Sequence, residues 1–181
     1  MKKKVILLIC AVCILAALIG VYSAVRSSST AEEEAKDTLF ELTADRIQAI
    51  SWTSDDGETL SFHRVDGQWS YDDEPELELD QTEMNTLCSG VTGITVYQTL
   101  EDVTDLSQYG LDVPQYVLKV TDTEGKMVEV ALGDENDAVN SLYVYKDGDD
   151  KTVYSVMASL KTAIAKHLSD LEAAEDSSTA G

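Results

Sequence analysis

Two histidines and one cysteine are the residues beyond the N-terminal region that could act as bases, nucleophiles or zinc ligands. A zinc site needs about four converging nitrogen or sulfur ligands, or three and a water molecule. His63, Cys88 and His167 are far apart in the sequence. A nucleophilic cysteine also needs a base and electropositive surroundings, whereas this part of the chain is strongly acidic. We interpret all three as structural residues and expect no catalytic residue, no metal ligand and no cofactor.

Three acidic clusters are the best remaining candidates for chemistry, and each is predicted to lie in a turn. Hard cations such as calcium take about six to eight oxygen ligands, but none of the clusters has the spacing of an EF-hand loop. We interpret them as solvated turns. A calcium site, and an envelope hydrolase that uses paired carboxylates in a cleft, are the alternatives. The clusters are Asp72-Asp73-Glu74, Asp134-Glu135-Asn136-Asp137 and Asp147-Gly148-Asp149-Asp150.

The charge balance excludes attraction to the phosphate backbone of nucleic acids. The chain has 181 residues, with 13 Lys and Arg against 34 Asp and Glu, and its net charge is −21. Such a surface repels phosphate groups. A hydrophobic content of 44% also argues against a wholly disordered chain. We therefore expect a folded protein that does not bind nucleic acid.

An apolar run near the N-terminus predicts a membrane anchor. Three lysines precede residues 5–25, which carry no charge, and a single Arg26 follows. As a helix this run would be roughly 32 Å long, close to the ~30 Å hydrocarbon core of a bilayer. The positive-inside rule places the N-terminus in the cytoplasm and the rest of the chain outside. A cleaved signal peptide is the alternative, although its apolar core is usually shorter. Cys10 and Cys13 are interpreted as small apolar residues of the run.

Composition divides the chain into four parts. Residues 1–26 are predicted to be a cytoplasmic stub and a transmembrane signal anchor, and residues 27–37 a polar stalk. Residues 38–171 have the length of one domain, and residues 172–181 are predicted to be a disordered tail. All acidic residues lie beyond the anchor, so that residues 27–181 carry a net charge of −25.

Alternating apolar residues predict strands in the first half of the domain. The pattern is centred on Ile50 and Trp52, and it recurs within residues 59–65 and 68–71. A helix is predicted to begin at Asp80, because a short acidic side chain can accept hydrogen bonds from the free N–H groups of the first turn. One apolar stripe runs along this helix, and Gly93 is placed to end it. The stripe consists of Met84, Leu87, Cys88 and Val91.

The second half repeats this order, with strands at residues 116–120, 127–132, 142–145 and 152–156. A closing helix would carry Leu160, Ile164, Leu168 and Leu171 on one side. The two halves indicate an internal duplication, with ordinary repeated hairpins as the alternative. The predicted class is α+β, with antiparallel β-sheets in two strand–helix halves, preceded by one N-terminal transmembrane helix. The expected core is Trp52, Phe62, Trp69, Leu87, Val91, Leu118, Val130, Leu132, Tyr143, Val153, Leu160 and Ile164.

Several short motifs resemble the bacterial domain-of-unknown-function 4340 family over residues 38–171. The most specific is Tyr109-Gly110-Leu111-Asp112-x-Pro114, which follows Asp105-Leu106. The resemblance implies a secreted or membrane-anchored α+β module, and some relatives accompany ABC-transport systems of the gliding-motility auxiliary type. It implies no catalytic residues. The other motifs are Ile47-x-x-Ile50-x-Trp52, Asp66-Gly67-Gln68-Trp69-Ser70-Tyr71, Val128-x-Val130-x-Leu132-Gly133, Leu142-Tyr143-Val144 and Val153-Tyr154-x-Val156.

The residues from Tyr109 to Pro114 are predicted to form a structural corner, with a binding loop as the alternative. Gly110 permits a positive φ that other residues resist. Leu111 would then enter the core while Asp112 caps the turn. Pro114 restricts the preceding residue to an extended conformation and so leads into the next strand.

The sequence favours a non-catalytic binding or scaffold module of the bacterial cell envelope. It would be held at the cell membrane by residues 5–25, with its C-terminal domain outside the cytoplasm and a partner among envelope proteins. An accessory subunit of an ABC-type transporter, in contact with a permease, is the alternative that the family resemblance supplies. A hydrolase that uses acidic residues is a lesser alternative.

Overall fold

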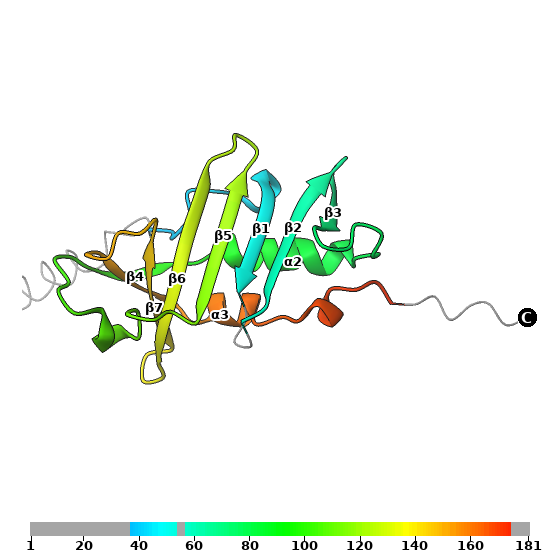
Figure 1. Cartoon of the computed structure of the whole chain (residues 1–181). Helices are drawn as coiled ribbons and strands as arrows, with labels where there is room; N and C mark the ends of the chain where they lie inside the picture. The colour runs from blue at the N-terminus through cyan, green and yellow to red at the C-terminus, as the bar shows by residue number, and fades with distance from the viewer. Residues whose placement is uncertain (1–36, 54–56, 175–181) are drawn as a thin grey trace, which may run out of the picture. The chain divides into compact units, whose positions relative to one another are not determined.

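An antiparallel sheet of eight strands organises the part of the chain that the computed structural model describes, residues 37–53 and 57–174 (Figure 1). The strand order across the sheet is β3-β2-β1-β5-β6-β7-β8-β4, so β3 and β4 form its two edges. The strands are β1 (Ile47–Thr53), β2 (Thr59–Val65), β3 (Gln68–Tyr71), β4 (Val96–Leu100), β5 (Tyr116–Asp122), β6 (Met127–Asn136), β7 (Ser141–Lys146) and β8 (Val153–Met157).

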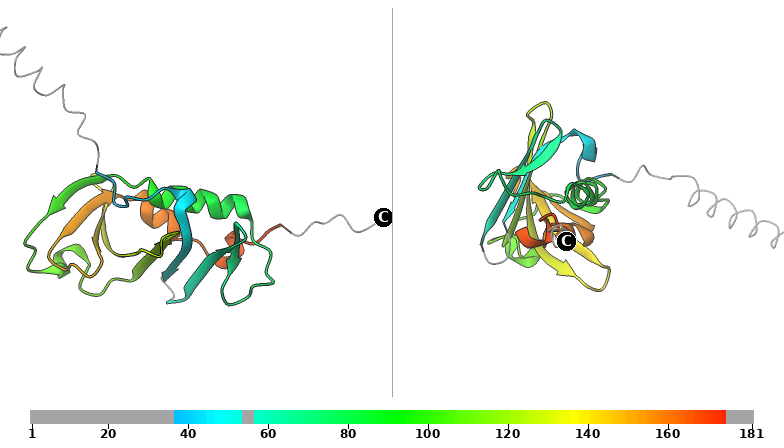
Figure 2. Two further views of the ribbon diagram at one scale, coloured as in Figure 1. Left: turned by 90° about the horizontal axis from the view of Figure 1, so that it is seen from above. Right: turned by 90° about the vertical axis from the view of Figure 1, so that its right-hand side faces the viewer.

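Two α-helices cover one face of this sheet. The views from above and from the end show α2 (Gln81–Thr92) and α3 (Ser159–Ile164) on the same side (Figure 2). Their buried residues belong to the same hydrophobic cluster as the inward-facing residues of the strands. Three short 3-10 helices complete the structure: η1 (Ala44–Arg46), η2 (Leu106–Tyr109) and η3 (Leu168–Asp170).

The predicted elements of the first half are confirmed. Strands β2 and β3 have the predicted bounds. The side chain of Asp80 accepts hydrogen bonds from the N–H groups of Thr82 and Glu83, at 2.8 and 3.1 Å, and so caps α2. All four residues of the predicted stripe are buried, and α2 ends at Gly93. Capping and periodicity therefore fix this helix locally.

The pairing of β1 with β5 joins the two halves into one sheet, where separate sheets were expected. Trp52 lies opposite Leu118, and Ile50 lies opposite Val120. The hairpins on either side have matching registers, since Ile50 pairs with Phe62 and Leu118 pairs with Val130, each 68 positions later. The two hairpins are thus related by an approximate two-fold axis at the centre of the sheet.

The predicted closing helix is wrong in length. Helix α3 ends at Ile164, and residues 165–167 lead into η3 without regular secondary structure. The segment after η3 pairs with the approach to α2: the Asp80 N–H donates to the Leu171 carbonyl at 2.8 Å, and Leu79 bridges Glu172. These contacts bury Leu171 without a helix. Glu172, at the start of the predicted tail, is therefore paired.

The acidic cluster at residues 134–137 does not lie in a turn throughout, as was predicted. Strand β6 continues through Asp134 and Glu135 to Asn136, after an irregularity in its pairing with β7 between Leu132 and Glu135. The pairs Glu135–Leu142 and Asn136–Ser141 hold this extension in the sheet. Backbone pairing with β7 thus overrides the polar composition of the segment.

The predicted core is buried except for Tyr143, which is partly exposed. Tyr143 packs against a second, smaller cluster formed by Leu111, Ala131 and Val153. Ala131 alternates with two residues of the main core, so this second cluster lies on the opposite face of the sheet. Both faces of the β6–β8 region are therefore covered.

The predicted anchor at residues 5–25, with Cys10 and Cys13, lies outside the described residues, as do most of the predicted stalk and residues 175–181 of the predicted tail. Within residues 37–53 and 57–174, no helix is both long and apolar enough to cross a membrane.

Candidate functional site

The corner from Tyr109 to Pro114 folds back onto strand β6. Gly110 ends η2 with a φ of 65°, as its residue type predicted. Leu111 is buried in the second cluster, also as predicted. The expected cap from Asp112 is wrong, because this exposed residue has no hydrogen bond to another described residue. Asp105 instead caps the start of η2, where its carboxylate accepts hydrogen bonds from the backbone and the hydroxyl of Ser107. These bonds, the hydroxyl bond first, lower the pKa of Asp105.

Two glycines allow the close approach of this corner to β6. A Cβ on Gly133 would lie 2.1 Å from the Tyr109 carbonyl oxygen and 2.7 Å from Cγ of Leu111. A Cβ on Gly110 would lie 2.9 Å from the backbone nitrogen of Asp134. Tyr109 also meets Tyr143 edge-on, with ring centroids 5.0 Å apart. The corner and β6 thus form one tightly packed unit.

A small polar pocket of about 250 Å³ lies beside this unit. Asp112, Asp134 and Glu135 line it together with Lys161 from α3. The Lys161 ammonium donates to Glu135 at 2.7 Å and lies 5.3 Å from the centre of the Tyr116 ring. The hydrogen bond to Glu135 raises the pKa of Lys161. A lysine held protonated in this way can bind an anion but is a poor nucleophile.

A larger groove of about 630 Å³ lies along the β3 edge of the sheet, and we call it the β3-edge groove. Its apolar part consists of Trp69 on β3 and of Pro75, Leu77 and Leu79 in the loop before α2. Its polar lining includes the exposed side chains Asp66, Glu76 and Glu78. The arrangement is an apolar floor with an acidic rim.

The side chain of Gln81 forms hydrogen bonds with the edge of β3 at this groove. The N–H of Trp69 donates to Oε1 of Gln81 at 2.7 Å, and the Trp69 carbonyl accepts from Nε2 at 3.0 Å. The side-chain amide thus takes the place of a neighbouring strand. This protects an edge that would otherwise offer free backbone groups to another chain.

The indole of Trp69 has a buried N–H with no hydrogen-bond partner among the described residues. The side chain is only 4% exposed, and the Arg64 guanidinium lies 4.6 Å from its ring centre. Arg64 also donates to Asn85 at 3.0 Å. Buried donors in proteins are nearly always paired; among the described residues the Trp69 indole, Nε of Arg64 and the Ser141 hydroxyl are exceptions.

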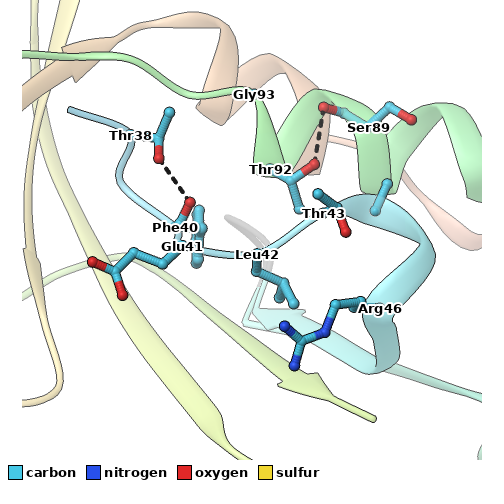
Figure 3. A pocket seen from close by; sticks show the side chains of 10 residues that line it. Thr38, Phe40, Glu41, Leu42, Thr43, Arg46, Ser89, Thr92 and Gly93 are labelled. Atoms are coloured by element: carbon cyan, nitrogen blue, oxygen red, sulfur yellow. Dashed lines mark hydrogen bonds between the residues drawn. The ribbon is translucent and has the colours of Figure 1, made fainter. Parts of the chain in front are cut away.

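A third hollow, of about 520 Å³, lies between residues 38–46 and the end of α2 (Figure 3). Two hydroxyl groups of its lining form hydrogen bonds with nearby carbonyl groups. The Thr38 hydroxyl donates to the Phe40 carbonyl at 2.9 Å, and the Thr92 hydroxyl donates to the Cys88 carbonyl at 3.0 Å. Arg46, at its rim, forms ion pairs with Asp122 and Glu124 at 3.3 and 2.9 Å. We interpret this hollow as the space between the first described segment, residues 38–46, and α2.

The histidines and Cys88 lie apart from these three hollows. His63 contacts Asp72 through Nδ1, and the backbone of His167 donates to Asp170 at the start of η3. Burial raises the pKa of Cys88 to about 12. A thiol that stays protonated at neutral pH is unreactive.

The two acidic clusters that do lie in turns bond to their own surroundings. In the first, Asp73 accepts a hydrogen bond from the Tyr71 hydroxyl at 3.2 Å. In the second, Asp147 accepts from the Glu129 N–H at 3.0 Å, and Asp149 accepts from the Lys151 N–H at 3.1 Å. Across the described part of the chain, no three His, Cys, Asp or Glu side chains converge in a way that could hold a metal ion.

The β3-edge groove and Lys161 were not identified from the sequence. The alternation Glu76-Leu77-Glu78-Leu79 was a usable signal, because alternating residues of an extended segment point in opposite directions. No local sequence pattern identifies Gln81 or Lys161, because they form hydrogen bonds with Trp69 and Glu135, which are distant from them in the sequence.

Comparison with known proteins bears out the family resemblance. A family model described as "Domain of unknown function (DUF4340)" matches the chain over residues 18–114 and again over residues 69–174. Neither a curated protein nor a solved structure matches it. The corner from Tyr109 to Pro114 and the facing Gly133 lie within these matches. The chain belongs to the DUF4340 family.

Proposed function

We propose that this protein is a non-catalytic binding module of the bacterial cell envelope, and that it binds another protein through the β3-edge groove. The observation that carries the proposal is the groove itself, in which an apolar floor is bordered by exposed carboxylates. Protein-binding surfaces commonly have an apolar centre and a polar rim.

An exposed apolar residue extends the floor of the groove to the surface. Val65, at the end of β2, lines the groove and is 50% exposed. Gln81 meanwhile pairs with the backbone of β3, which disfavours unspecific strand addition at Trp69. A partner would therefore be recognised through side chains more than through strand pairing.

The apolar run at residues 5–25 supports a place at the membrane. We propose that it spans the cytoplasmic membrane once, with the N-terminus in the cytoplasm and the β-sheet domain outside. Protease added to intact spheroplasts should then digest the domain. Protection of the domain would contradict this topology.

A site-specific crosslink tests the binding function. A photo-crosslinking amino acid at Val65 of the full chain, expressed in its own cells, should yield an adduct with one defined envelope protein. The same substitution at Val139, which is 65% exposed at the tip of the β6–β7 hairpin, is the matched control. No adduct at Val65, or the same adducts at both positions, would contradict the proposal. An adduct with a permease would identify the transporter alternative.

We also propose that the domain arose by internal duplication. The matching registers of the β1–β2 and β5–β6 hairpins and the two overlapping family matches support it. The first half has three strands before its helix, and the second half has a fourth, β8, between β7 and α3.

A further inference from the structure

The acidic rim of the β3-edge groove has no basic partner within the described chain. Asp66, Glu76 and Glu78 are all exposed, and none of them forms an ion pair with another described residue. The nearby cation Arg64 is held by the carbonyl of Gly67 and by Asn85. The groove therefore presents negative charge to whatever enters it, and charge complementarity favours a cationic ligand.

The floor of the groove requires apolar side chains in the same ligand. Trp69 and Leu79 form its buried part, and Leu77 is half-buried. Val65 is exposed at its margin. Charged groups at the rim and apolar groups at the floor match an extended segment, in which successive side chains point in opposite directions.

The indole N–H of Trp69 differs from that of Trp52 in its hydrogen bonding. It is a buried donor without an acceptor, while the indole of the other tryptophan, Trp52, donates to the Lys166 carbonyl at 3.4 Å.

We propose, on the basis of the binding function inferred above, that the β3-edge groove takes an extended basic segment of a partner protein. In this segment lysines or arginines alternate with apolar residues. The cations face Asp66, Glu76 and Glu78, and the apolar side chains lie on the floor beside Trp69.

The chain's C-terminal segment and the domain of a second copy are unsuitable occupants. The residues that follow the described chain begin with Glu175 and Asp176, and these would repel the acidic rim. A second copy would bring a domain with a net charge of −25 over residues 27–181. Like charges at a contact are unfavourable, so we assign the groove to a basic segment of a different protein.

Binding of synthetic peptides to the full chain in non-ionic detergent tests the proposal. The probe is fluorescein-labelled Lys-Val-Lys-Val-Lys-Val, compared with Glu-Val and Lys-Ser peptides of the same length. The Lys-Val peptide should bind more tightly than both. The double variant E76Q/E78Q should weaken its binding about fivefold, because each rim charge contributes modestly. The variant E101Q/D112N removes the same charge elsewhere and should leave the affinity unchanged.

The two indole N–H resonances provide a structural readout. Trp69 and Trp52 are the only tryptophans, and W69F assigns their signals. Addition of the Lys-Val peptide should shift the resonance of the Trp69 indole proton, because Trp69 lines the groove, and leave that of Trp52 in place.

Three results would overturn the proposal: no binding of the Lys-Val peptide, equal weakening by both double variants, or an unmoved Trp69 resonance. Failure of this inference is separable from failure of the binding function. A crosslink from Val65 whose yield is the same in E76Q/E78Q as in the unchanged chain would keep the groove as a binding site and exclude a basic ligand. Specific peptide binding without a cellular crosslink would leave the ligand chemistry standing and contradict the envelope partner.

Discussion

Gly133 shows at the scale of one residue why the corner and strand β6 depend on each other. Its missing side chain leaves room for the carbonyl of Tyr109 and for the side chain of Leu111. Any larger residue would displace the Tyr109–Pro114 corner from the sheet. The family motifs that contain Leu111 and Gly133 are distant in the sequence, but they contact each other in the folded domain.

We expect G133A to destabilise the domain by about 3 kcal/mol or more, because overpacking against backbone cannot be relieved by a rotamer change. Urea denaturation followed by circular dichroism measures this. The control is G93A, where the added Cβ would lie at an ordinary 3.4 Å from the Ser89 carbonyl and φ is −80°. Similar stability of the two variants would show that the corner does not pack as described.

Cys88 should be inert in the native protein. Burial raises its pKa from 9.0 to about 12, which lowers the thiolate population about a thousandfold. Iodoacetamide at pH 8 should therefore leave Cys88 unlabelled until urea unfolds the domain, as peptide mass mapping can show separately from Cys10 and Cys13. Rapid native labelling of Cys88 would mean that α2 opens readily.

At the scale of elements, the two edges of the sheet differ. Strand β3 is closed by the side chain of Gln81, which bonds both backbone groups of Trp69. At the other edge, the Val96 N–H at the start of β4 donates to the Asp37 carbonyl at 2.8 Å, and Thr38 bridges Thr95. The chain thus protects one edge with a side chain and the beginning of the other with its own backbone.

Q81A should destabilise the domain by about 1–3 kcal/mol, because it leaves partly buried backbone groups of Trp69 without partners. The freed edge should also promote self-association, which sedimentation velocity would detect. Q98A, a change of an exposed glutamine on β4, is the matched control. Equal stability of Q81A and Q98A would show that the amide bonds contribute little.

At the scale of the whole molecule, acid should remove part of the stability of a domain so rich in carboxylates. The pKa of Asp122 is lowered, first by the backbone hydrogen bond from Lys126 and further by Arg46. A hydrogen bond from Ser107 does the same for Asp105, and one from Thr152 for Asp149. A lowered native pKa contributes stability above the usual value of 3.8, and this stability is lost as the pH falls through the native pKa.

D122N should therefore lower the melting temperature at pH 7 and have a shrinking effect as the pH falls below 3.8. Calorimetry at several pH values would measure the difference from the wild-type protein. D112N, which neutralises an exposed carboxylate, should change little at pH 7. A D122N effect that is independent of pH would assign the loss to geometry and not to charge.

Part of the candidate site was accessible from sequence, and part was not. The conformation of Gly110 and the burial of Leu111 follow from the corner's own residue types, and both are confirmed. The cap expected from Asp112 does not form, whereas Asp105 caps the start of η2. The β3-edge groove depends on the return of the chain near Leu171 to the approach to α2, which no local pattern encodes.

Local patterns in the sequence account for the bounds of β2 and β3, the cap at Asp80 and the buried stripe of α2. Caps, turns and periodicity act over a few residues, so they can be read along the chain. The pairing of β1 with β5, the early end of α3 and the hydrogen bonds of Gln81 to β3 become visible only in the folded chain. Each of these depends on a contact between distant residues, whose free energy exists only once the chain has folded.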